Sequence, residues 1–431
     1  MKRLDVTIRL VGLAALMGMS WPALAQSPLI KPEDVGLSSA KLALIPEALK
    51  IQIGSGQIPG AIVLVARDGK VVHFEAQGVT NAVSKEPLQT DKIFGAGSLT
   101  KPMVAVAAMM LVEEGKLGLD DPVSKYIPEF GQPRQVRVLK PGSPPAPINV
   151  VFGPGPPSQT QSNAEYDLVP AVKPITLRML LTHTSGMHIF GLDNAFPLHG
   201  PTDTLAGFVP KLASVPLEYQ PGSRWAYSNN IDYEVIGRMI EVASGMNLKQ
   251  FLQRRLLGPL EMHDTDFGVR QDGTARGLPY APELGLTKAE EVKYFNASAG
   301  LWTTVADCEH FASMLANNGS YHGRQLLKPE TIKEMASNQI GSFLMGGYPT
   351  LGIPLAGLKF GFGFLVVTSP HATGSVLPVG SFGWNGDGTR LFWVIPEQHI
   401  VILSMVPLVG PEAAPLQRTI EAIVMSSIIH Q

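Results

Sequence analysis

Two β-hairpin patterns near opposite ends of the chain constrain its fold more than any other feature. Apolar and polar residues alternate from Gly60 to Gly78 around Asp68-Gly69, a pair typical of tight hairpin turns. A second hairpin pattern covers residues 391–405 around Pro396-Glu397-Gln398. Helical patterns flank the two hairpins, at residues 40–50 and 415–430. Hairpins give antiparallel pairing and the helices can cover it, so we predict an α+β fold with an antiparallel sheet flanked by helices.

The middle of the chain has a different pattern. Apolar residues recur at helical spacing in four stretches, at residues 103–115, 204–214, 231–244 and 247–256. We expect residues 96–289 to form a mostly helical inserted domain, and residues 26–95 together with 290–431 to form the sheet domain. Residues 131–174 are rich in Pro, Gly, Ser and Gln and are predicted as a loop. Loops of this length are either functional, as a lid or rim, or mobile, and both alternatives stay open.

The first 25 residues have the pattern of a secretory signal peptide. Lys2, Arg3 and Arg9 form a basic start, an apolar stretch follows from Leu10 to Trp21, and Ala23-Leu24-Ala25 fits a cleavage site. The apolar stretch is too short to span a bilayer, so no membrane anchor is expected after cleavage. We therefore expect a bacterial protein that is exported to the periplasm or secreted.

Charge and composition exclude several kinds of partner. The formal net charge is −2 and no basic run occurs, which argues against nucleic acid and anionic membrane surfaces. The ten His residues show no H-E-x-x-H spacing, and we expect neither a metal nor another cofactor. Cys308 is the only cysteine, so no intrachain disulfide can form, and its helical surroundings predict a buried apolar role. The sequence does not indicate the oligomeric state.

A Ser-x-x-Lys motif, Ser98-Leu99-Thr100-Lys101, carries the first chemical signal. Residues three apart share a helix face, so the Lys101 amine can hydrogen-bond the Ser98 hydroxyl and help to remove its proton. Such an arrangement turns a serine into a nucleophile without a histidine.

The motif is short enough to occur by chance, and a second copy is found at Ser38-Ser39-Ala40-Lys41. There, Ser38 or Ser39 is more simply the N-cap of a helix. The Ser98 copy has a different context, because the tight stretch Phe94-Gly95-Ala96-Gly97 precedes it and an apolar helical run with Pro102 in its first turn follows. A hydroxyl at a helix N-terminus lies beside free N–H groups and the positive end of the helix dipole, which favour an oxyanion.

A second acid/base group is expected near such a pair. Tyr227-Ser228-Asn229 lies in a loop before the helical pattern at 231–244. A phenol beside an ammonium has its ionised form favoured, so Tyr227 could act as a base toward Ser98 and later as an acid toward the leaving oxygen. Asn229 offers an amide for an acyl carbonyl. Tyr294-Phe295-Asn296 has the same Y-x-N pattern, so spacing alone leaves both tyrosines as ordinary packed residues.

A Gly-rich stretch, Phe382-Gly383-Trp384-Asn385-Gly386-Asp387-Gly388, leads into the C-terminal hairpin. A Gly-rich strand edge lets a substrate approach the backbone closely and exposes an N–H as an oxyanion donor. Taken alone, the stretch is also typical of a β-bulge or a turn.

With these three motifs in order, the chain resembles the serine β-lactamase and penicillin-binding-protein superfamily, specifically the class C β-lactamase-like branch that includes the family VIII carboxylesterases. Further similar stretches extend from about Gly36 to the C-terminus, at residues 175–186, 225–245, 258–262 and 298–307. The resemblance implies a β-lactamase/transpeptidase-like fold. It also implies that Ser98 is the nucleophile, Lys101 its proton partner and Tyr227 the general base.

The same resemblance separates the repeated motifs. Ser38 and Tyr294 fall outside the matching positions, which leaves them structural. His183, which would otherwise suggest a Ser-His pair, matches a family loop and is also taken as structural.

The chain departs from the family at its third motif. Penicillin-recognising members carry Lys-Thr-Gly or a His variant there, and the cation holds a substrate carboxylate, whereas this chain has Trp384-Asn385-Gly386. Trp384 is uncharged and has a broad apolar face, similar to family VIII carboxylesterases, so carboxylate binding should weaken and acyl or aryl groups should fit better. Asp387 is expected to supply the second oxyanion N–H beside that of Ser98, and its side chain could repel anions.

These observations predict a serine hydrolase that cleaves small-molecule esters with short acyl or aryl groups through an acyl-enzyme on Ser98. Weak β-lactam binding is compatible with this prediction. The alternatives are β-lactamase or D-Ala-peptidase-type amide hydrolysis, transacylation, and a non-catalytic penicillin-binding-like binding protein. The presence of Ser98, Lys101 and Tyr227 argues against the last alternative.

Overall fold

The computed structural model describes residues 29–81, 83–143, 165–187, 200, 202–228, 231–279, 285–346, 355–387, 389–408 and 410–429 of the 431-residue chain. The predicted signal at residues 1–25, the middle of the predicted loop at 131–174, and Asn229 lie outside these residues. Within the described part of the chain, no helix combines the length and the apolar composition needed to cross a bilayer.

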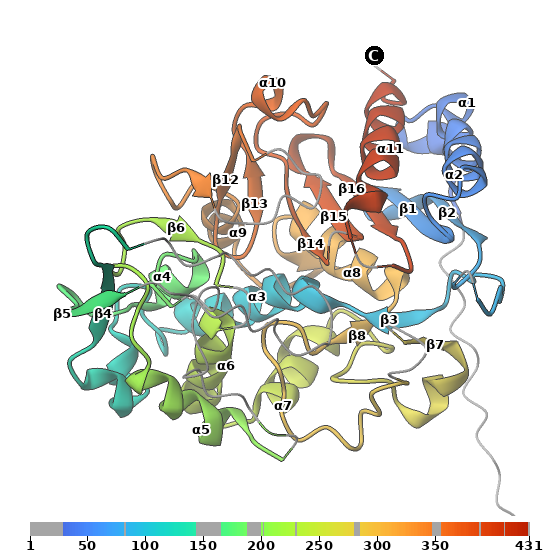
Figure 1. Cartoon of the computed structure of the whole chain (residues 1–431). Coiled ribbons are helices and arrows are strands. Elements are labelled where there is room, and N and C mark those ends of the chain that lie inside the picture. The colour runs from blue at the N-terminus through green and yellow to red at the C-terminus, as the bar shows by residue number, and fades with distance from the viewer. Residues whose placement is uncertain are drawn as a thin grey trace, which may run out of the picture.

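A seven-stranded antiparallel sheet forms one half of the molecule (Figure 1). Its strands, in spatial order, are β12 (Leu358–Phe360), β13 (Leu365–Val367), β14 (Phe382–Gly386), β15 (Arg390–Ile395), β16 (Ile400–Met405), β1 (Gly60–Arg67) and β2 (Lys70–Gly78). The two predicted hairpins are β1–β2 and β15–β16. β1 pairs with β16, with Val63 opposite Ser404, and this pairing joins the hairpins into one sheet. The predicted antiparallel sheet is therefore confirmed.

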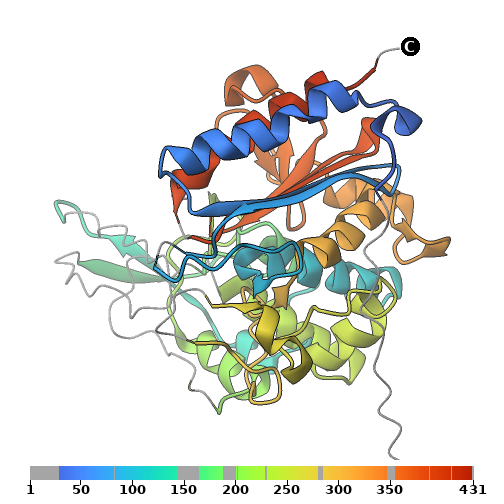
Figure 2. The same cartoon turned by 90° about the vertical axis from the view of Figure 1, so that its right-hand side faces the viewer.

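Helices cover both faces of this sheet (Figure 2). On one face lie α1 (Ser39–Leu42), α2 (Leu44–Gly54) and α11 (Ala414–Ser426), and on the other lies α8 (Val305–Ala316). Every residue of β15 and β16 is buried, as expected for strands that are covered on both sides. A main-chain hydrogen bond of 2.8 Å from Ser38 N to Ser427 O ties the start of α1 to the end of α11.

α3 (Thr100–Glu113) lies between the sheet and the helical half of the molecule (Figure 1). All its residues from Thr100 to Leu111 are buried, and most are apolar, which is the pattern of a helix enclosed on every side. It packs against α6 (Ile231–Ser244). One apolar cluster extends from α2 and α11 through the sheet to α3 and α6, so the start of α3 is held by the main core.

The predicted helical stretches of the middle segment appear as helices with short irregular extensions. They are α3, α5 (Leu205–Phe208) with a 3-10 turn at Val209–Ser214, α6, and α7 (Leu248–Leu252) with a π-helical turn at Gln253–Leu257. The remaining helices are α4 (Leu177–Leu181), α9 (Pro329–Met335) and α10 (Pro370–Thr373). Further 3-10 turns lie at Pro32–Val35, Gly97–Leu99, Val123–Lys125, Pro128–Gly131, Gln271–Arg276, Pro396–Gln398 and Pro411–Ala413.

Short strands fasten the loops around these helices. The pairs are β3 (Ile93–Gly95) with β7 (Gly277–Leu278) and β8 (Trp302–Thr303), β6 (Trp225–Ala226) with β11 (Met345–Gly346), and β9 (Ser320–Tyr321) with β10 (Arg324–Gln325). β3 leads into the Ser98 turn and β6 leads into Tyr227, so two motifs are held by strand pairing.

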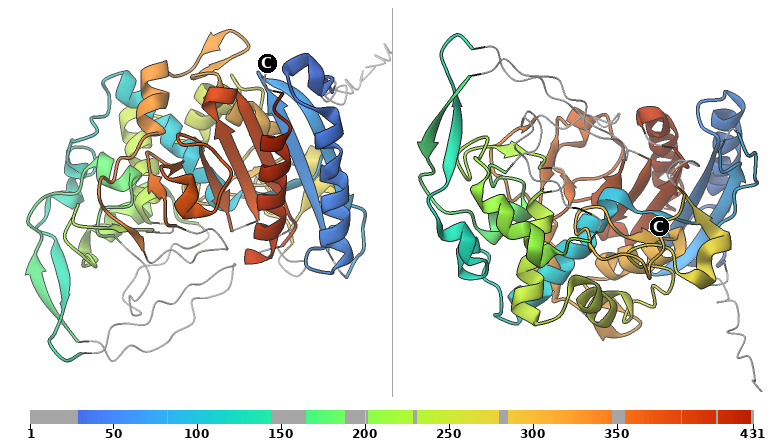
Figure 3. Two further views of the ribbon diagram at one scale, coloured as in Figure 1. Left: turned by 90° about the horizontal axis from the view of Figure 1, so that it is seen from above. Right: turned by 60° about the horizontal axis from the view of Figure 1, so that its bottom comes forward.

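The segment predicted as a loop at 131–174 contains strand structure at its ends. β4 (Gln135–Leu139) and β5 (Tyr166–Pro170) pair antiparallel, and they project from the helical half as a two-stranded ribbon (Figure 3). Val136 is buried and forms a β-bridge with Leu217, which anchors the base of the ribbon. The sequence did not indicate these strands because Pro and Gly dominate the segment and each apolar alternation is short.

Candidate active site

Ser98 lies in the 3-10 turn Gly97–Leu99, directly before α3. Gly97 has a φ of +54°, a conformation that residues with side chains rarely adopt, so glycine is favoured beside Ser98. Ala96, which precedes Gly97, is fixed by a hydrogen bond of 2.8 Å from its N–H to the carbonyl oxygen of Leu301. Ser98 is half-buried, so it is positioned by the core while keeping some exposed surface.

Lys101 brings its amine to Ser98 from one turn along the chain, as the motif spacing predicts. Its Nζ lies 3.1 Å from Ser98 Oγ and 3.0 Å from the carbonyl oxygen of Ser298. The side chain is 1 % exposed, and Nζ lies 5.1 Å from the ring centre of Tyr227 and 5.9 Å from that of Tyr233. The amine is therefore enclosed, with a hydroxyl and a main-chain carbonyl as hydrogen-bond partners.

Burial controls the charge of Lys101. Loss of hydration lowers its pKa to about 7, although the carboxylates of Glu234, Asp387 and Asp232 oppose this shift. Near neutral pH a large fraction of the amine is therefore uncharged and able to accept a proton from Ser98.

Tyr227 reaches the same serine oxygen from a distant part of the chain. Its OH lies 2.8 Å from Ser98 Oγ. The ring is 4 % exposed and packs against the rings of His183 and Trp384, at centroid distances of 4.7 Å and 5.5 Å. The residue before Tyr227 donates its N–H to the His183 carbonyl over 3.0 Å, which fixes the backbone here. The structure thus brings Ser98, Lys101 and Tyr227 together at one hydroxyl oxygen.

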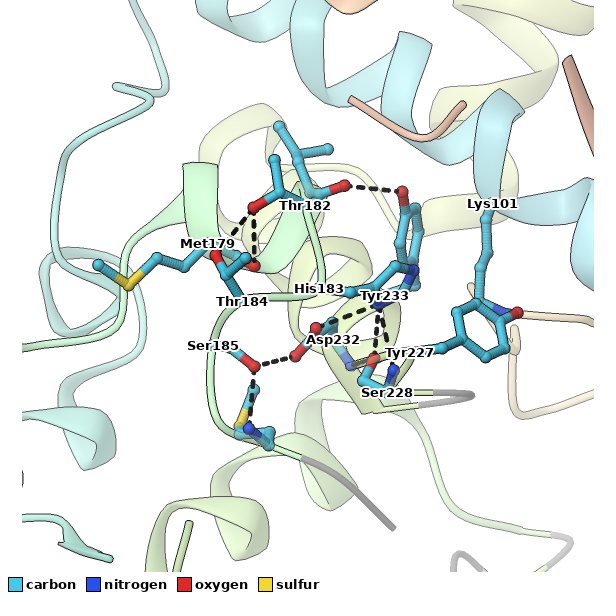
Figure 4. Close-up of polar contacts among 12 residues, drawn as sticks. Lys101, Met179, Thr182, His183, Thr184, Ser185, Tyr227, Ser228, Asp232 and Tyr233 are labelled. Atoms are coloured by element: carbon cyan, nitrogen blue, oxygen red, sulfur yellow. Dashed lines mark hydrogen bonds and ion pairs between the residues drawn. The ribbon is translucent and has the colours of Figure 1, made fainter. Parts of the chain in front are cut away.

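A buried polar cluster lies behind Tyr227 (Figure 4). Asp232 Oδ1 accepts a hydrogen bond of 2.5 Å from Ser185 Oγ, and Oδ2 lies 3.3 Å from His183 Nδ1. The same His183 nitrogen lies 2.9 Å from Ser228 Oγ. Burial raises the pKa of Asp232 well above its usual range. The cluster ties the His183 loop to the start of α6 and so supports Tyr227 from behind, in agreement with the structural role expected for His183.

Trp384 on β14 packs against the site rather than presenting an open surface. The sequence predicts a broad apolar face for substrate at this position. In the structure the side chain is 1 % exposed, because the rings of Tyr227 and Phe360 cover it at centroid distances of 5.5 Å and 5.3 Å. Trp384 therefore adds apolar support for Tyr227 where the family pattern has a cation.

The end of β14 lies against the Ser98 turn. A Cβ on Gly386 would lie 2.3 Å from the carbonyl oxygen of Ala96, so the close approach requires glycine. Asp387 follows with a φ of +52° and is half-buried, and Arg390 Nη1 lies 3.4 Å from its carboxylate. This arrangement places the Asp387 backbone near the Ser98 turn, and the oxyanion role of its N–H stays a prediction.

The second copies of both motifs have structural partners. Ser38 Oγ accepts the N–H of Lys41 over 3.3 Å and caps α1. Tyr294 OH donates to Glu234 Oε2 over 2.9 Å. Cys308 is buried, and burial raises the pKa of its thiol to about 12, as suits an apolar role. Within the described ranges, no group of three or more His, Cys, Asp or Glu is arranged to hold a metal ion.

The polar groups that surround Lys101 were not predicted from the sequence. Asp232 and Glu234 belong to a stretch of α6 in which every residue from Ile231 to Gly237 is buried. Carboxylates at positions that helical periodicity buries are a signal of a polar site, and this signal was present in the sequence. Ser298 contributes a main-chain carbonyl, which no side-chain pattern can indicate.

Comparison with known proteins gives matches over most of the chain. Residues 43–424 match the family model described as Beta-lactamase. An uncharacterized protein of Mycobacterium tuberculosis is 30 % identical over 376 residues, which cover 82 % of this chain and 86 % of the relative. Esterase EstB of Burkholderia gladioli is 28 % identical over 395 residues, which cover 83 % of this chain and 88 % of the relative.

Solved structures share the same fold. EstCE1, described as a hydrolase with promiscuous acyltransferase activity, superposes with a TM-score of 0.66 at 22 % sequence identity. The superposition covers 89 % of this chain and 98 % of EstCE1. The likeness therefore includes both the sheet and the helical half.

Proposed function

The chain belongs to the beta-lactamase family, and we propose that it is a serine hydrolase that cleaves small carboxylic esters through an acyl-enzyme on Ser98. One observation carries the proposal: Ser98 Oγ lies 3.1 Å from Lys101 Nζ and 2.8 Å from Tyr227 OH. Two groups that can exchange a proton with one hydroxyl oxygen are what nucleophilic catalysis needs. The esterase among the relatives supports an ester as the bond that is cleaved.

In the acylation step, Ser98 Oγ bonds to the ester carbonyl carbon while its proton passes to the uncharged Lys101 amine, directly or through Tyr227. The carbonyl oxygen becomes an oxyanion, for which we assign the main-chain N–H groups of Ser98 and Asp387 as donors. The carbon–oxygen bond to the alcohol then breaks, and Tyr227 gives its phenolic proton to the leaving oxygen and takes up the proton that Lys101 received. The products are the free alcohol and acylated Ser98.

In the deacylation step, water takes the place of the alcohol. Tyr227, whose phenolic proton passes to the uncharged Lys101 amine, accepts a proton from this water as the water oxygen bonds to the acyl carbon. The bond to Ser98 Oγ then breaks, the proton returns to Ser98, and the carboxylic acid leaves. An alcohol in place of water would give transacylation by the same steps.

Uncharged esters are the preferred substrates in this proposal. Trp384 offers no cation for a substrate carboxylate, and the carboxylate of Asp387 lies near the same strand end. A substrate anion would therefore gain little attraction here, so β-lactams should bind weakly. These features support placement near the family VIII carboxylesterases. We also propose, from the pattern of residues 1–25, that the protein is exported and meets its esters in the periplasm or outside the cell.

A substrate comparison on the full chain tests this proposal. Hydrolysis of p-nitrophenyl acetate, butyrate and octanoate is compared with turnover of a chromogenic cephalosporin. We expect ester hydrolysis in the wild type, and cephalosporin turnover slower by about a hundredfold or more, because Trp384 offers no cation for the cephalosporin carboxylate. A cephalosporin turned over faster than every ester would contradict the ester preference.

A further inference from the structure

Glu234 is a second buried carboxylate on α6, besides Asp232, and it influences Lys101. It takes no part in the proposed acylation and deacylation steps. Its side chain is buried at 2 % exposure. Oε2 accepts hydrogen bonds from Tyr294 OH over 2.9 Å and from Ala297 N over 3.2 Å. Oε1 accepts the N–H of Ser298 over 3.3 Å. All three donors belong to one short segment, so Glu234 fixes that segment to α6.

The segment that Glu234 holds also holds the catalytic motif. The carbonyl of Ser298 accepts the hydrogen bond of 3.0 Å from Lys101 Nζ. Three residues later, Leu301 N donates to Thr100 Oγ1 over 3.2 Å and Leu301 O accepts from Ala96 N over 2.8 Å. Residues 298–301 therefore contact the motif on both sides of Ser98.

Hydrogen bonds within residues 296–300 also restrict the conformation of this segment. Asn296 Oδ1 accepts the N–H groups of Ser298 and Ala299, over 3.0 Å and 2.7 Å. Gly300 donates to the carbonyl of Asn296 over 2.9 Å, and a Cβ on Gly300 would lie 2.6 Å from that oxygen. The N–H that Glu234 holds and the carbonyl that Lys101 meets therefore belong to the same hydrogen-bonded turn.

We infer that Glu234, held by Tyr294, is a positioning residue for Lys101. Its hydrogen bonds hold the Ser298 carbonyl toward the Lys101 amine. Its negative charge governs how readily that amine gives up its proton. The inference deepens the proposed function and rests on it for its catalytic meaning. The positioning of the Ser298 carbonyl by Glu234 is inferred from the hydrogen bonds alone.

The charges around Lys101 support the electrostatic part. Carboxylates face the amine from two elements: Glu234 and Asp232 on α6, and Asp387 after β14. Among these three, Glu234 is the strongest influence that raises the pKa of Lys101 against the effect of burial. The influence is mutual. Burial raises the pKa of Glu234 to about 7, and the nearby Lys101 acts in the opposite direction and lowers it. Removing the Glu234 charge should therefore lower the pKa of Lys101 further.

Tyr294 acts through the same carboxylate. Burial and the nearby Glu234 charge raise the pKa of its phenol, so the OH stays protonated and donates to Glu234. Asp203 and Glu241 also face Tyr294 and act in the same direction. Loss of this OH removes one stabilising bond from the carboxylate and should produce a smaller shift of the same sign as loss of the Glu234 charge.

The experiment compares Glu234→Gln, Tyr294→Phe and a matched control, Glu309→Gln, in the full chain. Glu309 is also a buried carboxyl with a pKa raised to about 7, but it lies in α8 and its hydrogen-bond partner is Ser313. The first measurement is titration of the Lys101 side chain by NMR in protein labelled with 13C-lysine, with the resonance assigned by Lys101→Met. The second is the pH profile of kcat/KM for p-nitrophenyl butyrate.

We expect Glu234→Gln to lower the Lys101 titration midpoint by about one pH unit, and the acid limb of kcat/KM to move by the same amount. At the pH optimum, kcat should fall about tenfold while KM changes little, because the carboxylate does not touch substrate. Tyr294→Phe should give the smaller shift, and Glu309→Gln should leave both midpoints in place. An unchanged Lys101 midpoint in Glu234→Gln, or a shift equal to that in Glu309→Gln, overturns the inference.

The two measurements separate this inference from the proposed function. Should the wild type hydrolyse no ester, the proposed function fails and the NMR titration still decides whether Glu234 governs Lys101. Should Glu234→Gln not fold, Tyr294→Phe gives the same titration with only one oxygen atom removed.

Discussion

The chain contains two Ser-x-x-Lys motifs, and their different surroundings show what the spacing alone does not provide. At the first, Ser38 Oγ accepts the main-chain N–H of Lys41, and the Lys41 side chain is exposed. At the second, the Lys101 side chain turns into the core, is 1 % exposed, and its amine reaches Ser98 Oγ. The first motif caps a helix and the second forms a reactive pair. Enclosure of the lysine, rather than the sequence spacing, makes this difference.

The two Y-x-N motifs differ in the same manner. Tyr227 and Tyr294 are both buried, but the OH of Tyr227 lies at the Ser98 hydroxyl, whereas the OH of Tyr294 lies at the Glu234 carboxylate. In the first comparison, the buried helix α3 holds the motif that contains Ser98. In the second, the pairing of β6 with β11 holds the backbone before Tyr227, the tyrosine that contacts Ser98.

Replacing the two serines should give opposite results. Ser98→Ala removes the oxygen that forms the acyl-enzyme, so hydrolysis of p-nitrophenyl butyrate should fall by about 10⁴-fold or more, to background. Ser38→Ala should leave the rate unchanged, because the Ser38 hydroxyl caps α1 and is not part of the site. Equal loss in both variants, or activity in Ser98→Ala, would show that the first motif had been misassigned as structural or the second as reactive.

Replacing the two tyrosines should separate direct from indirect roles. Tyr227→Phe removes the group that exchanges a proton with Ser98 and with water, so kcat should fall by about a hundredfold or more. Tyr294→Phe should cost about tenfold or less, because its OH acts through Glu234. Steady-state kinetics with p-nitrophenyl butyrate measure both variants, and a larger loss in Tyr294→Phe than in Tyr227→Phe would reverse the assignment.

The pH profile should depend on the enclosed Lys101 and not on the exposed Lys41. The pKa of Lys101 is lowered to about 7, and the uncharged amine is the form that accepts a proton. The rate constant kcat/KM should therefore be highest above pH 7 and fall about tenfold per pH unit well below it. Lys41→Met should leave this limb in place, whereas Lys101→Met should remove most activity. An acid limb centred near pH 4 or 5 would contradict Lys101 as the titrating group.

The smallest effect concerns stability. Ser38→Ala removes an N-cap, so the free energy of unfolding should decrease by about 1 kcal/mol, with kcat and KM unchanged. Urea denaturation followed by circular dichroism measures the change. Ser38→Thr keeps a capping oxygen and should recover most of the loss. A stability change of zero in Ser38→Ala would show that the 3.3 Å contact contributes nothing as a cap.

Local patterns predicted the elements of the fold better than their assembly. The turn at Asp68-Gly69 and the alternation around it indicate β1 and β2 without information from elsewhere in the chain. The pairing of β1 with β16 depends on two segments that share no local signal, and the sequence indicated only that some antiparallel sheet would form. β4 and β5 were missed because their pairing spans a Pro- and Gly-rich segment.

The candidate site shows the same limit. Ser98, Lys101 and Tyr227 could be selected because their side chains carry the chemistry and match a family pattern. The residue type at Trp384 was informative about charge, but the covering of its ring by Phe360 depends on tertiary packing. The Ser298 carbonyl is a main-chain group, and only the folded backbone brings it to Lys101.

The pairing of β1 with β16 determines when the molecule can be completed during synthesis. Val63 emerges from the ribosome long before its partner Ser404, so the β1–β2 hairpin waits with one edge unpaired while the whole helical half is made. Contacts of such large sequence separation form slowly, because a long loop must close before they give any stabilisation. β14 reaches the Ser98 turn only as part of this sheet. The nascent chain therefore remains without an assembled site until almost its last strand has been translated.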